Sequence, residues 1–96
     1  MLHVPAHQLH AFCQANRIQR LSLFGSVLKG QARRDSDVDL LVEFEAGQAP
    51  SLLGMVRMES ELSDMLGQRV DLRTPADLSR YFRQDVLDMA QVQYAA

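Results

Sequence analysis

The segment from residue 37 to residue 44 alternates between apolar and polar side chains and constrains the fold more than any other stretch. Successive side chains on a β-strand point to opposite faces, so alternate residues share one face. The apolar face carries Val38, Leu40, Val42 and Phe44. The opposite face carries Asp37, Asp39, Leu41 and Glu43. Because three carboxylates lie on it, the second face cannot be an ordinary core face.

Asp37 and Asp39 lie two residues apart on this predicted strand. Both carboxylates therefore project to the same side, with about 7 Å between their Cα atoms. Carboxylates this close repel each other, and a bound divalent cation removes the repulsion while using their oxygens as ligands. Magnesium held by a few carboxylates usually completes its coordination shell with substrate phosphates. The pair therefore predicts a Mg²⁺ site that acts on a phosphorylated substrate.

The pair Gly25 and Ser26 follows another short predicted strand, Arg20 to Phe24, and precedes a helix-compatible stretch over residues 27–32. A glycine lets a ligand approach the backbone closely. Unpaired N–H groups at a helix start, together with a serine hydroxyl, suit a phosphate group. We predict that Gly25 and Ser26 bind the phosphates of the substrate.

Helical spacing of apolar residues predicts two amphipathic helices. The first runs from Pro5 to Asn16 and the second from an N-cap at Ser51 to Leu66, with Gly67 as its C-cap. We expect the inward stripe of the second helix to consist of Leu52, Met55, Val56, Glu59, Leu62, Met65 and Leu66. A last helical region is predicted from Thr74 onward, with an apolar series at Leu78, Tyr81, Phe82, Val86 and Met89.

A third strand is predicted over residues 68–73. If Val70 and Leu72 pack on the core side, parity places Asp71 on the same face as the two earlier aspartates. Three carboxylates would then converge from neighbouring strands. Metal-assisted nucleotidyl transfer needs such a set, with two carboxylates holding magnesium and one helping to activate the attacking hydroxyl.

Other interpretations of the same residues are weaker. A P-loop requires a lysine and a hydroxyl residue after its second glycine, but Gln31 and Ala32 follow Gly30. An EF-hand loop beginning at Asp35 would need glycine at position six and glutamate at position twelve, where this chain has Leu40 and Ala46. The plain alternative is a simple turn at residues 25–26 and a polar loop entering a strand.

Two further features have plain structural interpretations. His3, His7 and His10 lie near one helix face at spacings that could bind a metal, but no Cys, Asp or Glu accompanies them, so we expect solvated histidines. Cys13 has no activating neighbour in the sequence, so we expect a small core residue rather than a nucleophile.

Composition limits the class of protein. A length of 96 residues fits one domain, residues 1–96. A net charge of −2 argues against direct binding of nucleic acid through the overall field. A single cysteine matches a reducing compartment, and neither a long apolar stretch nor a signal-like N-terminus is present. We therefore expect a cytoplasmic protein without a membrane segment.

The pattern G-S-x10-D-x-D, formed by Gly25, Ser26, Asp37 and Asp39, resembles the motif of the nucleotidyltransferase superfamily of the DNA polymerase beta type. The run LFGSVLKGQARRDSDVDLLVEF in a short chain is similar to the minimal nucleotidyltransferase (MNT) proteins, and Asp71 matches their third carboxylate. The resemblance implies an α/β (α+β) fold, a small mixed sheet with helices packed mainly on one face. One departure is Leu28-Lys29-Gly30 where many relatives have Ala-Arg-Gly, and Lys29 is expected to be solvated.

The resemblance also implies residue roles and a partner. Gly25 and Ser26 would bind nucleotide phosphates, Asp37 and Asp39 would hold Mg²⁺, and Asp71 would be the third metal or base carboxylate. MNT proteins are commonly antitoxins paired with a small helical HEPN toxin, and some transfer AMP from ATP to a tyrosine of that toxin. A hetero-oligomer with a HEPN protein is therefore expected, with a nucleoside triphosphate as donor.

Two other functions stay open at this stage. The protein could neutralise the toxin by binding alone, through exposed apolar residues late in the chain, for which the candidates are Tyr81, Phe82, Val86, Met89 and Tyr94. Alternatively it could transfer a nucleotide to a small molecule, as aminoglycoside-modifying relatives do. The absence of a substrate domain argues against that option. A homodimer with a shared cleft could supply the missing binding site.

Overall fold

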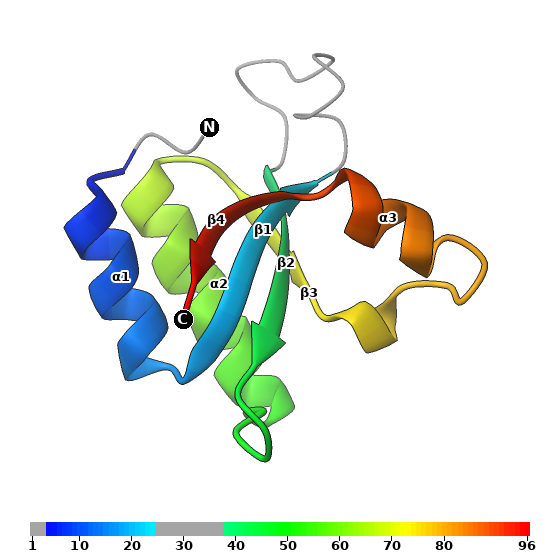
Figure 1. Cartoon of the computed structure of the whole chain (residues 1–96). Helices are drawn as coiled ribbons and strands as arrows, with labels where there is room; N and C mark the ends of the chain where they lie inside the picture. The colour runs from blue at the N-terminus through cyan, green and yellow to red at the C-terminus, as the bar shows by residue number, and fades with distance from the viewer. Residues whose placement is uncertain (1–3, 25–37) are drawn as a thin grey trace.

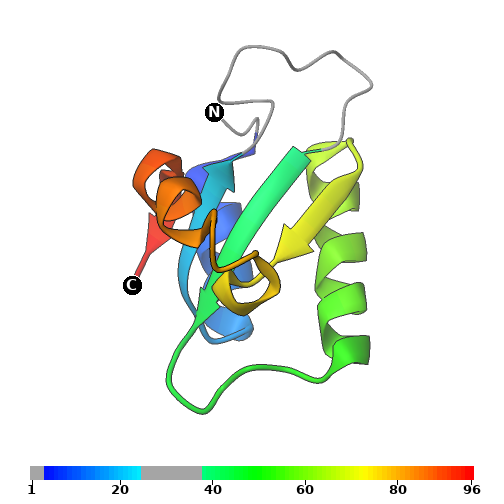
Figure 2. The same cartoon turned by 90° about the vertical axis from the view of Figure 1, so that its right-hand side faces the viewer.

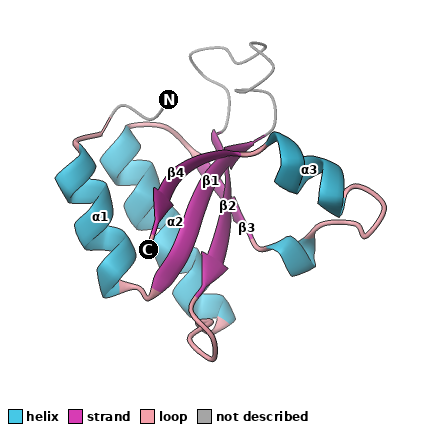
Figure 3. Ribbon diagram, viewed as in Figure 1, coloured by secondary structure: helices cyan, strands magenta, loops and turns pink. Residues whose placement is uncertain are grey.

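The structure is a computed structural model that describes residues 4–24 and 38–96 and contains one mixed four-stranded sheet in the order β3-β2-β1-β4 (Figures 1 and 3). β1 pairs antiparallel with both β2 and β4, whereas β2 and β3 run parallel. The elements in chain order are α1 (Ala6–Ala15), β1 (Ile18–Phe24), β2 (Val38–Phe44), α2 (Leu52–Leu66), β3 (Val70–Arg73), the 3₁₀ helix η2 (Pro75–Asp77), α3 (Arg83–Met89) and β4 (Gln91–Ala95).

The helices α1 and α2 cover one face of the sheet, and the shorter α3 lies over the other (Figures 1 and 2). The predicted mixed sheet with helices mainly on one face is confirmed. The core lies between the sheet and the two longer helices. Its buried side chains include Leu9, Phe12 and Cys13 of α1, Met58 and Leu62 of α2, and Leu21, Leu23, Leu40, Val42 and Leu72 of the sheet.

Local signals in the sequence account for the bounds of α2. The Ser51 hydroxyl accepts a hydrogen bond from the Gly54 amide N–H at 3.2 Å, which satisfies one of the free donors of the first turn. Gly67 ends the helix with a φ of 67°, a left-handed conformation that glycine adopts without a steric penalty. Both predicted caps are confirmed.

The predicted inward stripe of α2 is partly wrong. Leu52 is 81 % exposed and Val56 is also exposed, whereas Met58, which the stripe omitted, is buried. The physical reason is visible in Figure 2, where the first turns of α2 extend beyond the end of the short strand β3. Leu62 is buried, as predicted.

The C-terminal region also differs from the prediction of one helical region. It consists of η2, the single short helix α3, and the strand β4, which the sequence analysis missed. β4 pairs with β1, with Tyr94 opposite Leu21. Tyr94 is therefore buried, which corrects its assignment to an exposed apolar surface.

Cys13 is fully buried among the core residues, as expected. Burial raises the pKa of its thiol from the ordinary value of 9.0 to about 12, because the thiolate is poorly solvated there. The thiol is therefore neutral at physiological pH and unsuited to nucleophilic chemistry. Within the described residues, no helix has both the length and the apolar character to cross a membrane.

Candidate active site

Asp39 and Asp71 lie directly opposite each other on the parallel strands β2 and β3. Neighbouring strands are about 4.8 Å apart, and paired residues project to the same face. That face is opposite to the core, because Leu40 and Leu72, the next residues on each strand, are buried in the core. Both aspartates are half-buried. The predicted placement of Asp71 on the same face of the sheet as Asp39 is confirmed.

Arg73 lies two residues beyond Asp71 on β3 and shares its face. Its Nη2 atom is 3.1 Å from Asp71 Oδ2, forming an ion pair that is also a hydrogen bond. Both side chains are more than one-third exposed, so the pair contributes about 1 kcal/mol or less to stability. The Asp71 carboxylate can therefore exchange this cation for another one at little cost.

The remaining predicted site residues, Gly25, Ser26 and Asp37, lie outside the described residues. Their assigned roles stay predictions. Phe24, the last residue of β1, pairs with Asp39, so β1 ends beside the strand residue that carries this carboxylate. The predicted short helix over residues 27–32 also lies outside the described part of the chain.

The sheet face that carries Asp39 and Asp71 is acidic at one end only. Ser22 is buried opposite Leu41, and beyond them Arg20 Nη1 lies 3.6 Å from Glu43 Oε2. This separation is longer than a hydrogen bond, so the contact is an ion pair only. The acidic site is therefore limited to the end of the sheet that carries Asp39 and Asp71.

The donor chemistry at this end suits a hard divalent cation, since adjacent carboxylate oxygens are the ligands that Mg²⁺ prefers. Among residues 4–24 and 38–96, no group of three or more His, Cys, Asp or Glu side chains is close enough to hold a metal. Asp37, which is predicted to hold the metal together with Asp39, is not among these residues. His7 and His10 are exposed, as expected, and the His10 ring contacts the Tyr94 ring edge-on at 5.1 Å.

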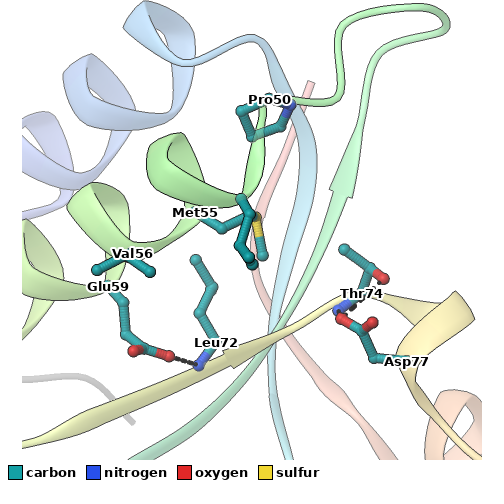
Figure 4. A pocket seen from close by; sticks show the side chains of 8 residues that line it. Pro50, Met55, Val56, Glu59, Leu72, Thr74 and Asp77 are labelled. Atoms are coloured by element: carbon teal, nitrogen blue, oxygen red, sulfur yellow. Dashed lines mark hydrogen bonds between the residues drawn. The ribbon is translucent and has the colours of Figure 1, made fainter.

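A pocket of about 460 Å³ opens between the first turns of α2 and the edge strand β3 (Figure 4). Neither Asp39 nor Asp71 lines it, so it is separate from the carboxylate pair. The lining residues are Pro50, Leu52, Met55, Val56, Glu59, Leu72, Thr74 and Asp77.

Several large apolar side chains are exposed in and around α3. Tyr81, Phe82 and Met89 are exposed, with Tyr81 reaching 76 %, and Val92 of β4 is exposed as well. The Arg80 guanidinium lies 5.1 Å from the centre of the Tyr81 ring. We call these four apolar residues the α3 surface. It confirms the expected exposure of Tyr81, Phe82 and Met89, whereas Val86 is only half-exposed.

The contacts that α2 makes to the strand carrying Asp71 were not predicted from the sequence. The Leu72 amide N–H donates to Glu59 Oε2 at 2.8 Å, and the Val70 amide N–H donates to the Ser63 hydroxyl at 3.0 Å. One signal was available, because Glu59 interrupts a stripe that is otherwise apolar. A charged residue on the inward face of a helix usually has a specific partner.

Comparison with known proteins identifies the family. A family model described as the nucleotidyltransferase domain matches residues 7–92. The protein adenylyltransferase MntA of Thermococcus cleftensis is 41 % identical over 70 residues, which cover 73 % of this chain and 69 % of that protein.

Solved structures agree with this assignment. A candidate minimal nucleotidyltransferase is 38 % identical, with a TM-score of 0.69 and coverage of 92 % of this chain and 95 % of that one. A toxin-antitoxin crystal structure with AMP-PNP has a TM-score of 0.76 at 21 % identity, covering 97 % of this chain and 75 % of that one, and shows likeness of fold. The chain belongs to the nucleotidyltransferase domain family and is a nucleotidyltransferase of the MNT type.

Proposed function

We propose that residues 1–96 form one minimal nucleotidyltransferase domain, which acts in the cytoplasm as an antitoxin by transferring AMP from ATP to a HEPN-family toxin. The observation that carries the proposal is the direct pairing of Asp39 with Asp71 on the face opposite the core. Two relatives support it by analogy: one is a protein adenylyltransferase, and another is part of a toxin-antitoxin structure with AMP-PNP.

Each predicted residue has a role in the proposed reaction. Gly25 and Ser26 bind the triphosphate, and Asp37 and Asp39 hold Mg²⁺, with Asp71 as a third ligand or a base. When bound, Mg²⁺ neutralises negative charge on the phosphates in the transition state. In this proposal Asp71, as a base, accepts the proton of the attacking hydroxyl, which belongs to a tyrosine of the toxin.

The bonds balance in a single displacement. The hydroxyl oxygen forms a bond to the α-phosphorus of ATP, and the bond from that phosphorus to the bridging oxygen breaks. Pyrophosphate leaves, and the hydroxyl proton passes to the Asp71 carboxylate and then to solvent. The toxin carries AMP as a phosphodiester.

The test is incubation of the purified protein with ATP labelled at the α-phosphate, Mg²⁺ and the HEPN-family toxin proposed as its partner. We expect label on the partner with the wild type and none with Asp39→Asn or Asp71→Asn. A matched control is Asp64→Asn, because Asp64 is an exposed aspartate on α2, outside the strands that carry Asp39 and Asp71. Absence of label with the wild type, under conditions in which the two proteins bind each other, would contradict the proposal.

A second function is favoured by the α3 surface. The four large apolar side chains of this surface are exposed, and apolar side chains that gather on the surface of a protein are typical of an interface. In this second proposal, the protein neutralises the toxin by covering it. If Asp39→Asn combined with Asp71→Asn still neutralised the toxin fully while Phe82→Ser did not, binding rather than AMP transfer would be the function that matters.

A further inference from the structure

Within the described part of the chain, the strand that carries Asp71 has a sheet neighbour on one side only. β3 is four residues long and lies at the edge of the sheet, beside β2. On a strand, alternate residues direct their backbone N–H groups to opposite sides. Hydrogen bonding to β2 therefore leaves the N–H groups of Val70 and Leu72, which flank Asp71, directed away from the sheet. An unpaired edge of this kind tends to fray or to pair with another chain.

Two side chains of α2 take the place of a neighbouring strand on this side. The Ser63 hydroxyl accepts from the Val70 amide at 3.0 Å. Glu59 Oε2 accepts from the Leu72 amide at 2.8 Å, a contact drawn in Figure 4. The Ser63 hydroxyl also donates to the Glu59 carbonyl oxygen at 2.8 Å, so its hydrogen is used as well. Both contacts are partly buried, where an unmade hydrogen bond is costly.

The spacing of the two acceptors matches the spacing of the two donors. Four residues along a helix rise about 6.0 Å, and two residues along a strand rise about 6.6 Å. Glu59 and Ser63, one helical turn apart, can therefore meet the amides of Leu72 and Val70 together. The residue held between these two amides is Asp71.

We propose that Glu59 and Ser63 are positioning residues that fix Asp71 opposite Asp39. This role rests on the proposed function, in which the Asp71 carboxylate helps to bind Mg²⁺. A metal site tolerates only small displacements of its ligands. Loss of the Glu59 acceptor would free the end of β3 and let Asp71 move relative to Asp39.

A general contribution to stability is the competing explanation, and a double-mutant cycle separates the two. If Glu59 acts through Asp71, then Glu59→Ala weakens metal binding in the wild type but not in the Asp71→Asn background. If Glu59 only stabilises the fold, the losses of metal-binding free energy caused by Glu59→Ala and Asp71→Asn add in the double variant. The probe is Mn²⁺ alone, a paramagnetic substitute for Mg²⁺ whose binding is measured by electron paramagnetic resonance.

We expect Glu59→Ala to weaken Mn²⁺ binding about tenfold, as is usual for residues that hold a metal ligand in place. Amide hydrogen exchange at Leu72 should become faster in the same variant. Glu59→Gln keeps an oxygen acceptor and should restore binding to within about threefold of the wild type, and Ser63→Ala should give a smaller loss than Glu59→Ala. The matched control is Glu61→Ala, an exposed glutamate on the same helix.

Two results would overturn the positioning role. One is unchanged Mn²⁺ binding in Glu59→Ala while exchange at Leu72 becomes faster, and the other is an equal loss in the Asp71→Asn background. Because Glu59→Gln and Ser63→Ala change the contacts mildly, the test survives if Glu59→Ala fails to fold. A wild type that binds Mn²⁺ but transfers no AMP would contradict the proposed function, while the metal measurements would still decide the role of Glu59.

Discussion

Asp39 and Asp71 are locked to each other by the register of β2 and β3, because a shift of one strand by a single residue would turn one carboxylate into the core. Their separation is therefore a property of the sheet rather than of two flexible side chains. This fixed spacing distinguishes the pair from acidic residues gathered on a loop, whose geometry can adapt.

Replacement of Asp71 by asparagine should separate activity from stability. We expect AMP transfer to fall at least about a hundredfold, because one metal ligand or base is lost. The free energy of unfolding should change by less than about 1 kcal/mol, because the ion pair lost with Arg73 is exposed. Labelled transfer and urea denaturation measure the two effects. A loss of stability of several kcal/mol would assign Asp71 a structural role instead.

Removal of the Arg73 cation should strengthen metal binding. The guanidinium competes with a divalent cation for Asp71, so Arg73→Gln should raise Mn²⁺ affinity a few-fold, within the range set by an exposed ion pair of about 1 kcal/mol or less. Titration with Mn²⁺ at low and high salt measures the effect, which should shrink as salt screens the charge. Arg57→Gln, on the exposed surface of α2, should leave the affinity unchanged. Weaker binding in Arg73→Gln would mean that Arg73 holds Asp71 in place rather than competing for it.

Truncation of two leucines of α2 should affect the free energy of unfolding to very different extents. Leu62 has no exposed surface, so Leu62→Ala should lower the free energy of unfolding by about 3 kcal/mol, through lost burial and a cavity. Leu52 is largely exposed, so Leu52→Ala should change the free energy of unfolding by less than about 0.5 kcal/mol. Denaturant unfolding of both variants tests the inward face of the helix. Equal losses would show that the predicted stripe was right and the observed orientation wrong.

The buried thiol of Cys13 should make the protein less stable at alkaline pH. The pKa is raised in the folded state to about 12, so the folded chain keeps its proton where the unfolded chain has lost it. Stability from this group is complete below pH 9.0 and falls as pH rises toward 12, by about 1.4 kcal/mol per pH unit. The unfolding free energy of the wild type and of Cys13→Ala, measured from pH 8 to pH 11, isolates the effect. Parallel curves for the two proteins would contradict it.

The strands, and the faces on which their residues lie, could be predicted best from the sequence. The alternation around Asp39 and the parity of Asp71 both follow from the two-residue period of a strand, which the sequence displays directly. Contacts between distant segments were not visible in that way. Tyr94 is buried because β4 pairs with β1. Leu52 is exposed where the first turns of α2 extend beyond the end of β3 (Figure 2). Neither fact follows from local periodicity. The partners of Glu59 and Ser63 depend on the packing of α2 along β3 and were equally hidden.

The hydrogen bonds on the outer side of β3 also limit how this protein can associate with others. The amide of Val70 donates to Ser63, that of Leu72 to Glu59, and that of Thr74 to Asp77 Oδ2 at 3.0 Å. Three successive outward donors are thus occupied by the protein's own side chains. A second chain has no free N–H groups to pair with along this edge, so strand addition to the described sheet would have to occur at β4. A partner that docks beside β3 therefore finds the outward N–H groups of Val70, Leu72 and Thr74 already bonded.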